Sequence, residues 1–410
     1  MDLVERSREL FRGLERDVFG GALHSASSEV GDLVSALSCA HHALALRHID
    51  PALALSELRT LYAACQLESG LLAEERPLTA EGQAERAAEF GPLYREDGPS
   101  WLIGPPVAAY AAAKLAQQLG DPARGILERA TRQLDAIWAE RLPPDTPLPV
   151  ILHPLEAVAY GSALFDGVIE STDMDEWRDE AANITRSAVA CRLDPERALR
   201  AGHPFVVEDP IFCGWLLLGL EEAARAWELL GEGDVVRKLR IRADMIAEGV
   251  AERLWWDEEE LFAGVDRRRE APLRAVTAGG LVPAAAHTLL AGGNARRALD
   301  RHLRPSSTPL WSSRGIAVAP VERDEALDPD AVPWRGGGIS AATCYWGHLA
   351  LVHGQRTADA RVAREQLERL TADAGFREFY DVRSGEGSGG GANGGFTWPT
   401  LALEMRAQES

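Results

Sequence analysis

Apolar residues recur along most of the chain at intervals of three and four positions, the spacing that places them on one side of an α-helix. Between 51 and 67, for example, the apolar positions include Leu55, Leu58, Leu61, Tyr62 and Cys65. Ala, Leu, Glu and Arg dominate these stretches and favour helix. The pattern predicts about a dozen helices, over residues 2–18, 28–47, 51–67, 105–118, 121–141, 153–168, 174–191, 209–231, 233–254, 276–291, 338–354, 356–374 and 396–407.

Short segments rich in Gly, Pro and Asp separate these helices into pairs, as at His48–Pro51, Leu119–Pro122 and Leu230–Asp234. Consecutive helices joined in this way are expected to run antiparallel, and to form either an open solenoid or a closed ring of hairpins around a funnel. The chain has no fixed repeat period, which weighs against the solenoid. No segment resembles an interdomain linker, so we expect one domain over residues 1–410.

Longer irregular segments interrupt the helical pattern. They are rich in aromatic, Gly and charged residues, a composition typical of loops that converge on a functional site. These segments are residues 68–104, 142–152, 192–208, 255–275, 303–337 and 382–395.

The net charge restricts the classes of partner. The chain has 43 Lys and Arg against 63 Asp and Glu, a formal net charge of −20, which would repel nucleic acid and anionic membranes. Its five cysteines have no CxxC spacing, which fits neither a disulfide framework nor a zinc cluster. The N-terminus has no signal-like apolar region, and no run is long enough to span a membrane. We therefore expect a cytoplasmic protein that binds neither nucleic acid nor membranes; the sequence does not indicate an oligomeric state.

Two of the irregular segments carry candidate chemistry. The segment 330–338 contains Trp334, Arg335 and three consecutive glycines, which permit a ligand to approach the backbone beside an aromatic ring and a cation. In the segment 375–381, Glu378 lies among aromatic residues, where desolvation could raise its pKa into the range for acid–base catalysis. A surface loop and an Arg-paired structural carboxylate are the simpler alternatives.

Two further features give weaker indications of function. The glycine-rich segment 385–398 resembles a phosphate-binding loop only superficially, because no Lys-Ser/Thr follows it, and a lid or an irregular linker fits better. His41 and His42 are adjacent, and neighbours on a helix point about 100° apart, so both cannot bind one metal ion. We expect neither a metal ion nor a cofactor.

Taken together, the loop motifs resemble the C-terminal signature of the family-63 glycoside hydrolases, which reads YWRGPVW, GFxEYYDP, TGxGxG and FSWTAA. The corresponding segments are Trp334–Gly336, Gly375–Asp381, Gly385–Gly387 and Phe396–Trp398. Upstream, His42–Leu46 with Asp50–Pro51, Gly104–Pro106, His153–Glu156 and Asp209–Pro210 resemble the family's WDSxFHAxAL with its DP, QPP, HPWE and second DP. The closest subgroup in size is the short bacterial mannosylglycerate and glucosylglycerate hydrolases. The resemblance implies an all-α fold, an (α/α)6 barrel of six helical hairpins with long loops at one mouth.

The family hydrolyses glycosides with inversion, using two carboxylates that flank the scissile bond. The resemblance places Glu378 at the position of the general base. The acid belongs to HPWESGxDNSPRWD, which aligns without gaps with residues 153–166 and has Tyr160 at the acid position. It also implies substrate-binding positions for His42, His153, Glu156, Trp334, Arg335, Phe379, Tyr380 and Trp398.

Other sugar-contacting positions differ from the family pattern. Leu37, Ser38 and Cys39 replace WDS, Gly104 replaces the Gln of QPP, and Ile339 falls in the region where YWRGPVW has aromatic residues. We expect a roomier, less polar pocket than a sugar site, because an unbonded buried polar group costs roughly 1–3 kcal/mol.

Three functions follow as alternatives. The preferred interpretation is a remodelled enzyme of specialised metabolism that uses Glu378 as a base and Tyr160 as a hydrogen-bond donor, for an isomerisation, cyclisation or elimination on a bulky metabolite. The second is a glycosidase that acts on small glycosides such as glucosyl- or mannosylglycerate, with Tyr160 as a weak acid. The third is a non-catalytic, ligand-binding pseudoglycosidase.

Overall fold

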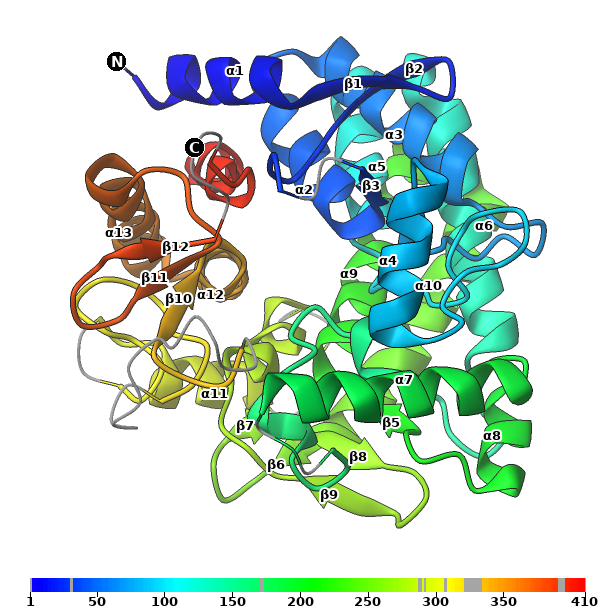
Figure 1. Cartoon of the computed structure of the whole chain (residues 1–410). Helices are drawn as coiled ribbons and strands as arrows, with labels where there is room; N and C mark the ends of the chain where they lie inside the picture. The colour runs from blue at the N-terminus through cyan, green and yellow to red at the C-terminus, as the bar shows by residue number, and fades with distance from the viewer. Residues whose placement is uncertain are drawn as a thin grey trace.

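The computed structural model describes residues 2–29, 32–169, 171, 173–286, 290, 293–305, 308–320, 334–389 and 395–409. Helices dominate these residues and the strands are short (Figure 1). Residues 330–333 and 390–394, which belong to two of the candidate loops, lie outside the described residues.

Six helical segments pack side by side in an inner ring. Each contacts the next, and η8 contacts α2 to close the ring. Every residue of α2 is buried, and α9 and α12 are almost as apolar, as is typical of helices that have protein on all sides. The inner segments are α2 (Ala36–Leu46), α5 (Val107–Leu119), α9 (Pro210–Leu229), η6 (Pro283–Ala286), α12 (Ala341–His353) and η8 (Trp398–Leu401) with α15 (Ala402–Gln408).

An outer layer covers this ring. Five outer helices pack on the inner segments that precede them in the chain, and α1 (Leu3–Leu14) lies beside α13, where the Arg6 guanidinium donates to the Thr371 carbonyl at 2.8 Å. The fold is therefore an (α/α)6 barrel, as predicted. The other outer helices are α3 (Pro51–Cys65), α6 (Arg124–Glu140), α10 (Gly233–Gly249), α11 (Asn294–His302) and α13 (Thr357–Ala374).

Capping residues fix where the helices begin. Asp50 accepts from the backbone N–H groups of Ala52 and Leu53 ahead of α3, and Asp209 accepts from Phe212 N–H ahead of α9. Both caps precede a proline at the first helical position, where its missing N–H costs nothing. These two Asp-Pro pairs are the ones that the sequence pattern singles out.

Smaller elements occupy the connections between the rings. The additional helices are α4 (Ala80–Phe90), α7 (Met174–Ala190), α8 (Pro195–Ala201), a π-helix at Val250–Leu254, and the turns η1 (Asp121–Ala123), η2 (Pro154–Glu156), η3 (Ala163–Phe165) and η5 (Ala278–Leu281). The strands are antiparallel pairs or triplets: β1 (Glu15–Val18) with β2 (Gly21–His24), β3 (Leu33–Ser35) with β4 (Glu75–Pro77), β5 (Val207–Glu208) with β8 (Gly264–Asp266) and β9 (Ala271–Leu273), β6 (Trp255–Trp256) with β7 (Leu261–Phe262), and β10 (Gly338–Ser340) with β11 (Phe379–Asp381) and β12 (Gly387–Ser388).

The helix predicted over 153–168 is wrong. This segment contains two short 3-10 turns, η2 and η3. The His153 side chain accepts from Leu155 N–H at 3.0 Å, and Pro154 lacks the N–H that a longer helix would need. The segment is therefore a loop that follows the rim of the barrel.

Other segments also differ from the pattern. The segment 276–291 holds only the short turns η5 and η6 among its described residues, and the start of 28–47 is the strand β3. Conversely, α4 and α8 fall within the predicted irregular segments 68–104 and 192–208, and α11 lies outside every predicted helix. Thr79 caps α4 by accepting from Gly82 N–H, a local signal that the weak apolar periodicity of this helix conceals.

Candidate active site

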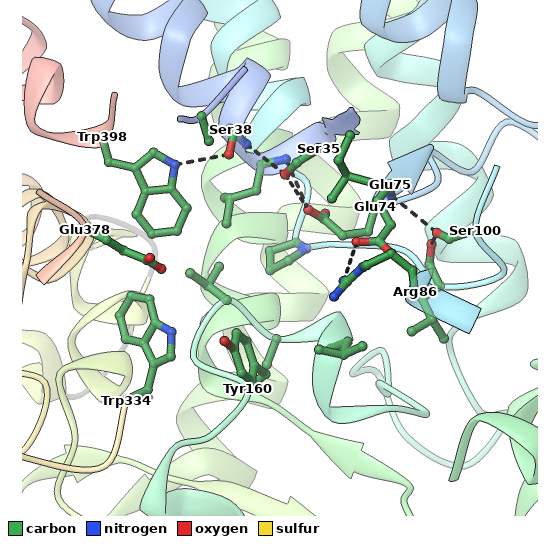
Figure 2. A pocket seen from close by; sticks show the side chains of 18 of the residues that line it. Ser35, Ser38, Glu74, Glu75, Arg86, Ser100, Tyr160, Trp334, Glu378 and Trp398 are labelled. Atoms are coloured by element: carbon green, nitrogen blue, oxygen red, sulfur yellow. Dashed lines mark hydrogen bonds and ion pairs between the residues drawn. The ribbon is translucent and has the colours of Figure 1, made fainter. Parts of the chain in front are cut away.

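A cavity of about 300 Å³ opens between the loops at one mouth of the barrel. Its wall is mixed: apolar side chains alternate with serines, carboxylates and an arginine, as is usual for small-molecule sites. The apolar part includes Leu33, Leu37, Leu93, Leu102, Leu155 and Val158, and the polar part includes Ser35, Ser38, Glu74, Glu75, Arg86 and Ser100. The cavity is also lined by Tyr160, Trp334, Glu378 and Trp398 (Figure 2).

Glu378 points into this cavity from the end of a short sheet (Figure 2). It directly precedes β11, which pairs with β10 and β12. Gly389 packs against it: a Cβ there would lie 2.8 Å from the Glu378 Cβ and 3.0 Å from Oε2. Burial, with a smaller effect of Glu29, raises the pKa of Glu378 to about 7. A carboxyl with this pKa can accept a proton near neutral pH.

Tyr160 lies on the same cavity, carried by the loop 153–166. Glu156 anchors this loop, because its buried carboxylate pairs with Arg141 at 2.6 Å and accepts from the backbone N–H groups of Ile103 and Leu152. Burial, followed by the negative charge of Glu378, raises the pKa of the Tyr160 phenol above its ordinary value of 10. Tyr160 therefore stays protonated at neutral pH.

Aromatic side chains form the wall around Glu378. The Trp334 ring stacks on Trp346 at a centroid distance of 5.9 Å and meets the edge of Phe379 at 5.1 Å. Trp398 lies across from Trp334 in Figure 2, and its indole N–H donates to the Ser38 hydroxyl at 3.2 Å. These rings give this part of the cavity a flat apolar surface.

The opposite wall carries charge. Glu75 pairs with Arg86 at 2.9 Å, and Glu74 lies beside it, with Ser35 and the backbone N–H of Leu37 donating to its Oε1. Burial raises the pKa of Glu74 to about 8. Figure 2 shows these three side chains across the cavity from Glu378.

The profile of the mannosylglycerate hydrolase MGH1-like glycoside hydrolase domain matches residues 35–399. The chain belongs to this family. A curated mannosylglycerate hydrolase from Rubrobacter radiotolerans is 26% identical over 338 residues, which are 74% of this chain and 73% of that protein. This relationship agrees with the resemblance that the loop motifs carry.

Solved structures show the same fold. The family-63 mannosylglycerate hydrolase of Thermus thermophilus in complex with glucose has a TM-score of 0.76 at 21% identity, covering 98% of this chain and 99% of that one. The same enzyme in complex with Tris reaches 0.80 at 20% identity, with the same coverage. The neutral trehalase of Saccharomyces cerevisiae has a TM-score of 0.59 at 15% identity, covering 95% of this chain and 74% of that one.

The structure of this MGH1-like chain brings together four residues that the sequence singled out: Tyr160, Trp334, Glu378 and Trp398 all line the cavity. Arg335, Phe379 and Tyr380 are outside the lining set but stabilise its loops. Arg335 pairs with Asp166 at 2.6 Å, and the Tyr380 hydroxyl donates to the Gly375 carbonyl at 2.8 Å.

Three others lie behind the wall. Glu156 is the loop anchor described above, and His153 is fully buried, with burial lowering its pKa to about 3. His42 bonds through Nδ1 to Glu57 at 2.9 Å and through Nε2 to Thr397 at 2.7 Å. The resemblance assigns substrate contact to these three residues, but in the structure they support the cavity wall from behind.

His42 also belongs to a buried group of potential metal ligands. The donor atoms of His24, His42 and Glu57 lie within 4.8 Å of one another. Both Nδ1 atoms are bonded to Glu57, at 2.7 Å from His24 and 2.9 Å from His42. A metal ion would have to displace these bonds, so the group is better described as a hydrogen-bonded network that joins β2, α2 and α3.

The sequence motifs did not single out three charged residues of the cavity wall: Glu74, Glu75 and Arg86. The signal that could have found them is a pair of carboxylates that directly follows the apolar run Leu71–Ala73, where a solvent-exposed loop would not need apolar residues. Arg86 could not be found, because its helix α4 was not predicted.

Among the described residues, no helix is long and apolar enough to cross a membrane.

Proposed function

We propose that this protein is a hydrolase of small O-glycosides. The observation that carries the proposal is that Glu378 and Tyr160 line one cavity together with two tryptophans; the motif resemblance assigns the base position to Glu378 and the acid position to Tyr160. Family membership favours this function over the isomerisation, cyclisation or elimination that the altered acid position suggested. We further propose that residues 1–410 form one domain and that the protein works on a small molecule without a cofactor.

Glu378 acts as the general base in this proposal. Above pH 7 its carboxylate accepts a proton from a water molecule held between it and the anomeric carbon, and the water attacks with inversion. The apolar surroundings that raise its pKa to about 7 also make it a stronger base than an exposed carboxylate. Trp334 and Trp398 hold the sugar ring against this water.

Tyr160 acts as the proton donor to the leaving group, and it is a poor one. A phenol with a pKa above 10 transfers its proton at neutral pH less readily than a carboxyl tuned to that range. The enzyme is therefore fastest where the leaving group needs little protonation. Because Tyr160 is a weak proton donor, we expect the rate to depend strongly on the leaving group.

Glycosyl fluorides test this assignment, because fluoride departs with little help from an acid. We expect the wild type to hydrolyse a mannosyl or glucosyl fluoride, Tyr160→Phe to retain most of that rate, and Glu378→Gln to lose it. On the corresponding glycerol glycoside, Tyr160→Phe should lose at least about tenfold in kcat/KM, which is about 1.4 kcal/mol of transition-state stabilisation. Glu85→Gln is the matched control, because Glu85 is exposed on α4.

Two outcomes refute the proposal. Binding of a glycoside without turnover of any substrate supports the pseudoglycosidase. Equal losses for Tyr160→Phe on the fluoride and on the glycoside show that Tyr160 supports the fold of its loop rather than donating a proton.

A cytoplasmic location is part of the same proposal. All five cysteines are buried free thiols, which suits a reducing compartment.

A further inference from the structure

The geometry of inversion fixes which wall of the cavity meets the leaving group, and this step rests on the proposed function. The attacking water and the leaving group lie on opposite sides of the anomeric carbon. With Glu378 holding the water, the leaving group points to the wall that Figure 2 shows across the cavity. That wall contains Glu74, Glu75 and Arg86.

Arg86 is the positively charged residue of this wall, and it already forms two ion pairs. Its Nη2 donates to Glu75 at 2.9 Å and its Nη1 to Glu89 at 3.3 Å. The Tyr94 hydroxyl also donates to Glu75, which holds that carboxylate in place. A leaving group with a carboxylate would therefore meet a cation whose charge Glu75 already balances, although the Nε of Arg86 has no hydrogen-bond partner in the described part of the chain.

Glu74 adds a second acidic group with spare capacity. Its Oε1 accepts from Ser35 and Leu37, but its Oε2 is buried without a partner among the described residues. Gly104 makes this position possible, because a Cβ at residue 104 would lie 1.8 Å from Oε2. Burial raises the pKa of Glu74 to about 8, so the group is neutral or negative across the working range, and it gives an anion no attraction.

We propose that the wall formed by Glu74, Glu75 and Arg86 selects an uncharged, hydroxyl-bearing leaving group and disfavours one that carries a carboxylate. The hydroxyl groups of a polyol can donate to carboxylate and serine oxygens on this wall without displacing Arg86. A glycerate leaving group has the same carbon skeleton as glycerol but brings a negative charge. This chain thus prefers a glycerol-like partner, whereas its curated relative is named for mannosylglycerate.

Sulfur-linked glycosides separate this inference from catalysis, because they bind without being cleaved. Calorimetry at pH 8 would compare one sugar linked through sulfur to glycerol and to glycerate. We expect the wild type to bind the glycerol compound at least about tenfold more tightly. Glu75→Gln should leave Arg86 paired with Glu89 alone and reduce that preference about tenfold, and Glu74→Gln should reduce it in the same direction. Glu85→Gln changes the same charge on the residue next to Arg86 and should leave the preference unaltered.

The outcomes are distinct. Equal or tighter binding of the glycerate compound by the wild type overturns the inference, as does an effect of Glu75→Gln and Glu74→Gln no larger than that of Glu85→Gln. Failure to bind either compound also overturns it. If the preference is found but the oxygen-linked glycosides are not cleaved, the inference stands and the proposed hydrolysis fails.

Discussion

Replacing Glu378 by Gln should stabilise the folded protein at alkaline pH, because the wild type must hold a charged carboxylate in a desolvated place. The pKa of Glu378 rises from 4.5 to about 7 on folding. The unfolded chain releases this proton near pH 4.5, whereas the folded chain keeps it until about pH 7. The free energy of unfolding therefore falls as pH increases from about 4.5 to about 7, and the full penalty is present above pH 7.

The size of this penalty follows from the pKa difference. The difference of 7 − 4.5 = 2.5 corresponds to about 3.4 kcal/mol at 1.36 kcal/mol per unit. Glu378 is only partly buried, and the Gln amide also loses some hydration, so we expect a net gain of about 1–2 kcal/mol at pH 9 and a smaller one at pH 5.

Urea unfolding at both pH values measures this gain, with Glu85→Gln as the control for removing an exposed carboxylate. A gain of equal size at pH 5 and pH 9 would show that the effect comes from packing rather than from the charge. A loss of stability at pH 9 would refute the reasoning, because it would mean that the ionised carboxylate is held by favourable interactions.

Two other predictions concern catalysis and the loop of Tyr160. With Glu378 as the base, kcat/KM should rise with pH to a plateau above about pH 7. With Tyr160 as the donor, kcat/KM should not fall again below about pH 10, because the phenol keeps its proton. A decrease in kcat/KM near neutral pH would indicate a carboxyl donor instead. Glu156→Ala should lower the free energy of unfolding by about 3–5 kcal/mol in urea titrations, because it leaves the Arg141 guanidinium buried without its partner; a loss under about 1 kcal/mol would show that water reaches Arg141.

The fold was largely predictable because its inner helices obey simple rules. Segments such as α2 and α9 are apolar nearly all round and begin at Asp-Pro or Ser caps, so their positions follow from local sequence. The segment 153–168 was misassigned because its apolar spacing mimics a helix, while its structure is set by distant partners such as Arg141. Tertiary contacts of that kind are invisible to a periodicity analysis.

The site was predictable in part for a similar reason. Glu378, Tyr160, Trp334 and Trp398 belong to motifs, and the structure brings them to one cavity. The expectation of a less polar pocket considered only the residues lost at Leu37, Ser38 and Gly104. It did not anticipate that Glu74 would fill the space beside Gly104, because a compensating side chain from another segment appears only once the chain is folded.

Time-resolved proton NMR of the anomeric signals tests the central claim most directly. The protein would be incubated at pH 8 with an oxygen-linked glucosyl or mannosyl glycoside of glycerol, and with the corresponding fluoride. Inverting hydrolysis by Glu378 predicts that free sugar appears first as the anomer opposite to that of the substrate, before mutarotation, and that Glu378→Gln abolishes its release. Release of the same anomer, or conversion of the substrate to a product without free sugar, would contradict the account.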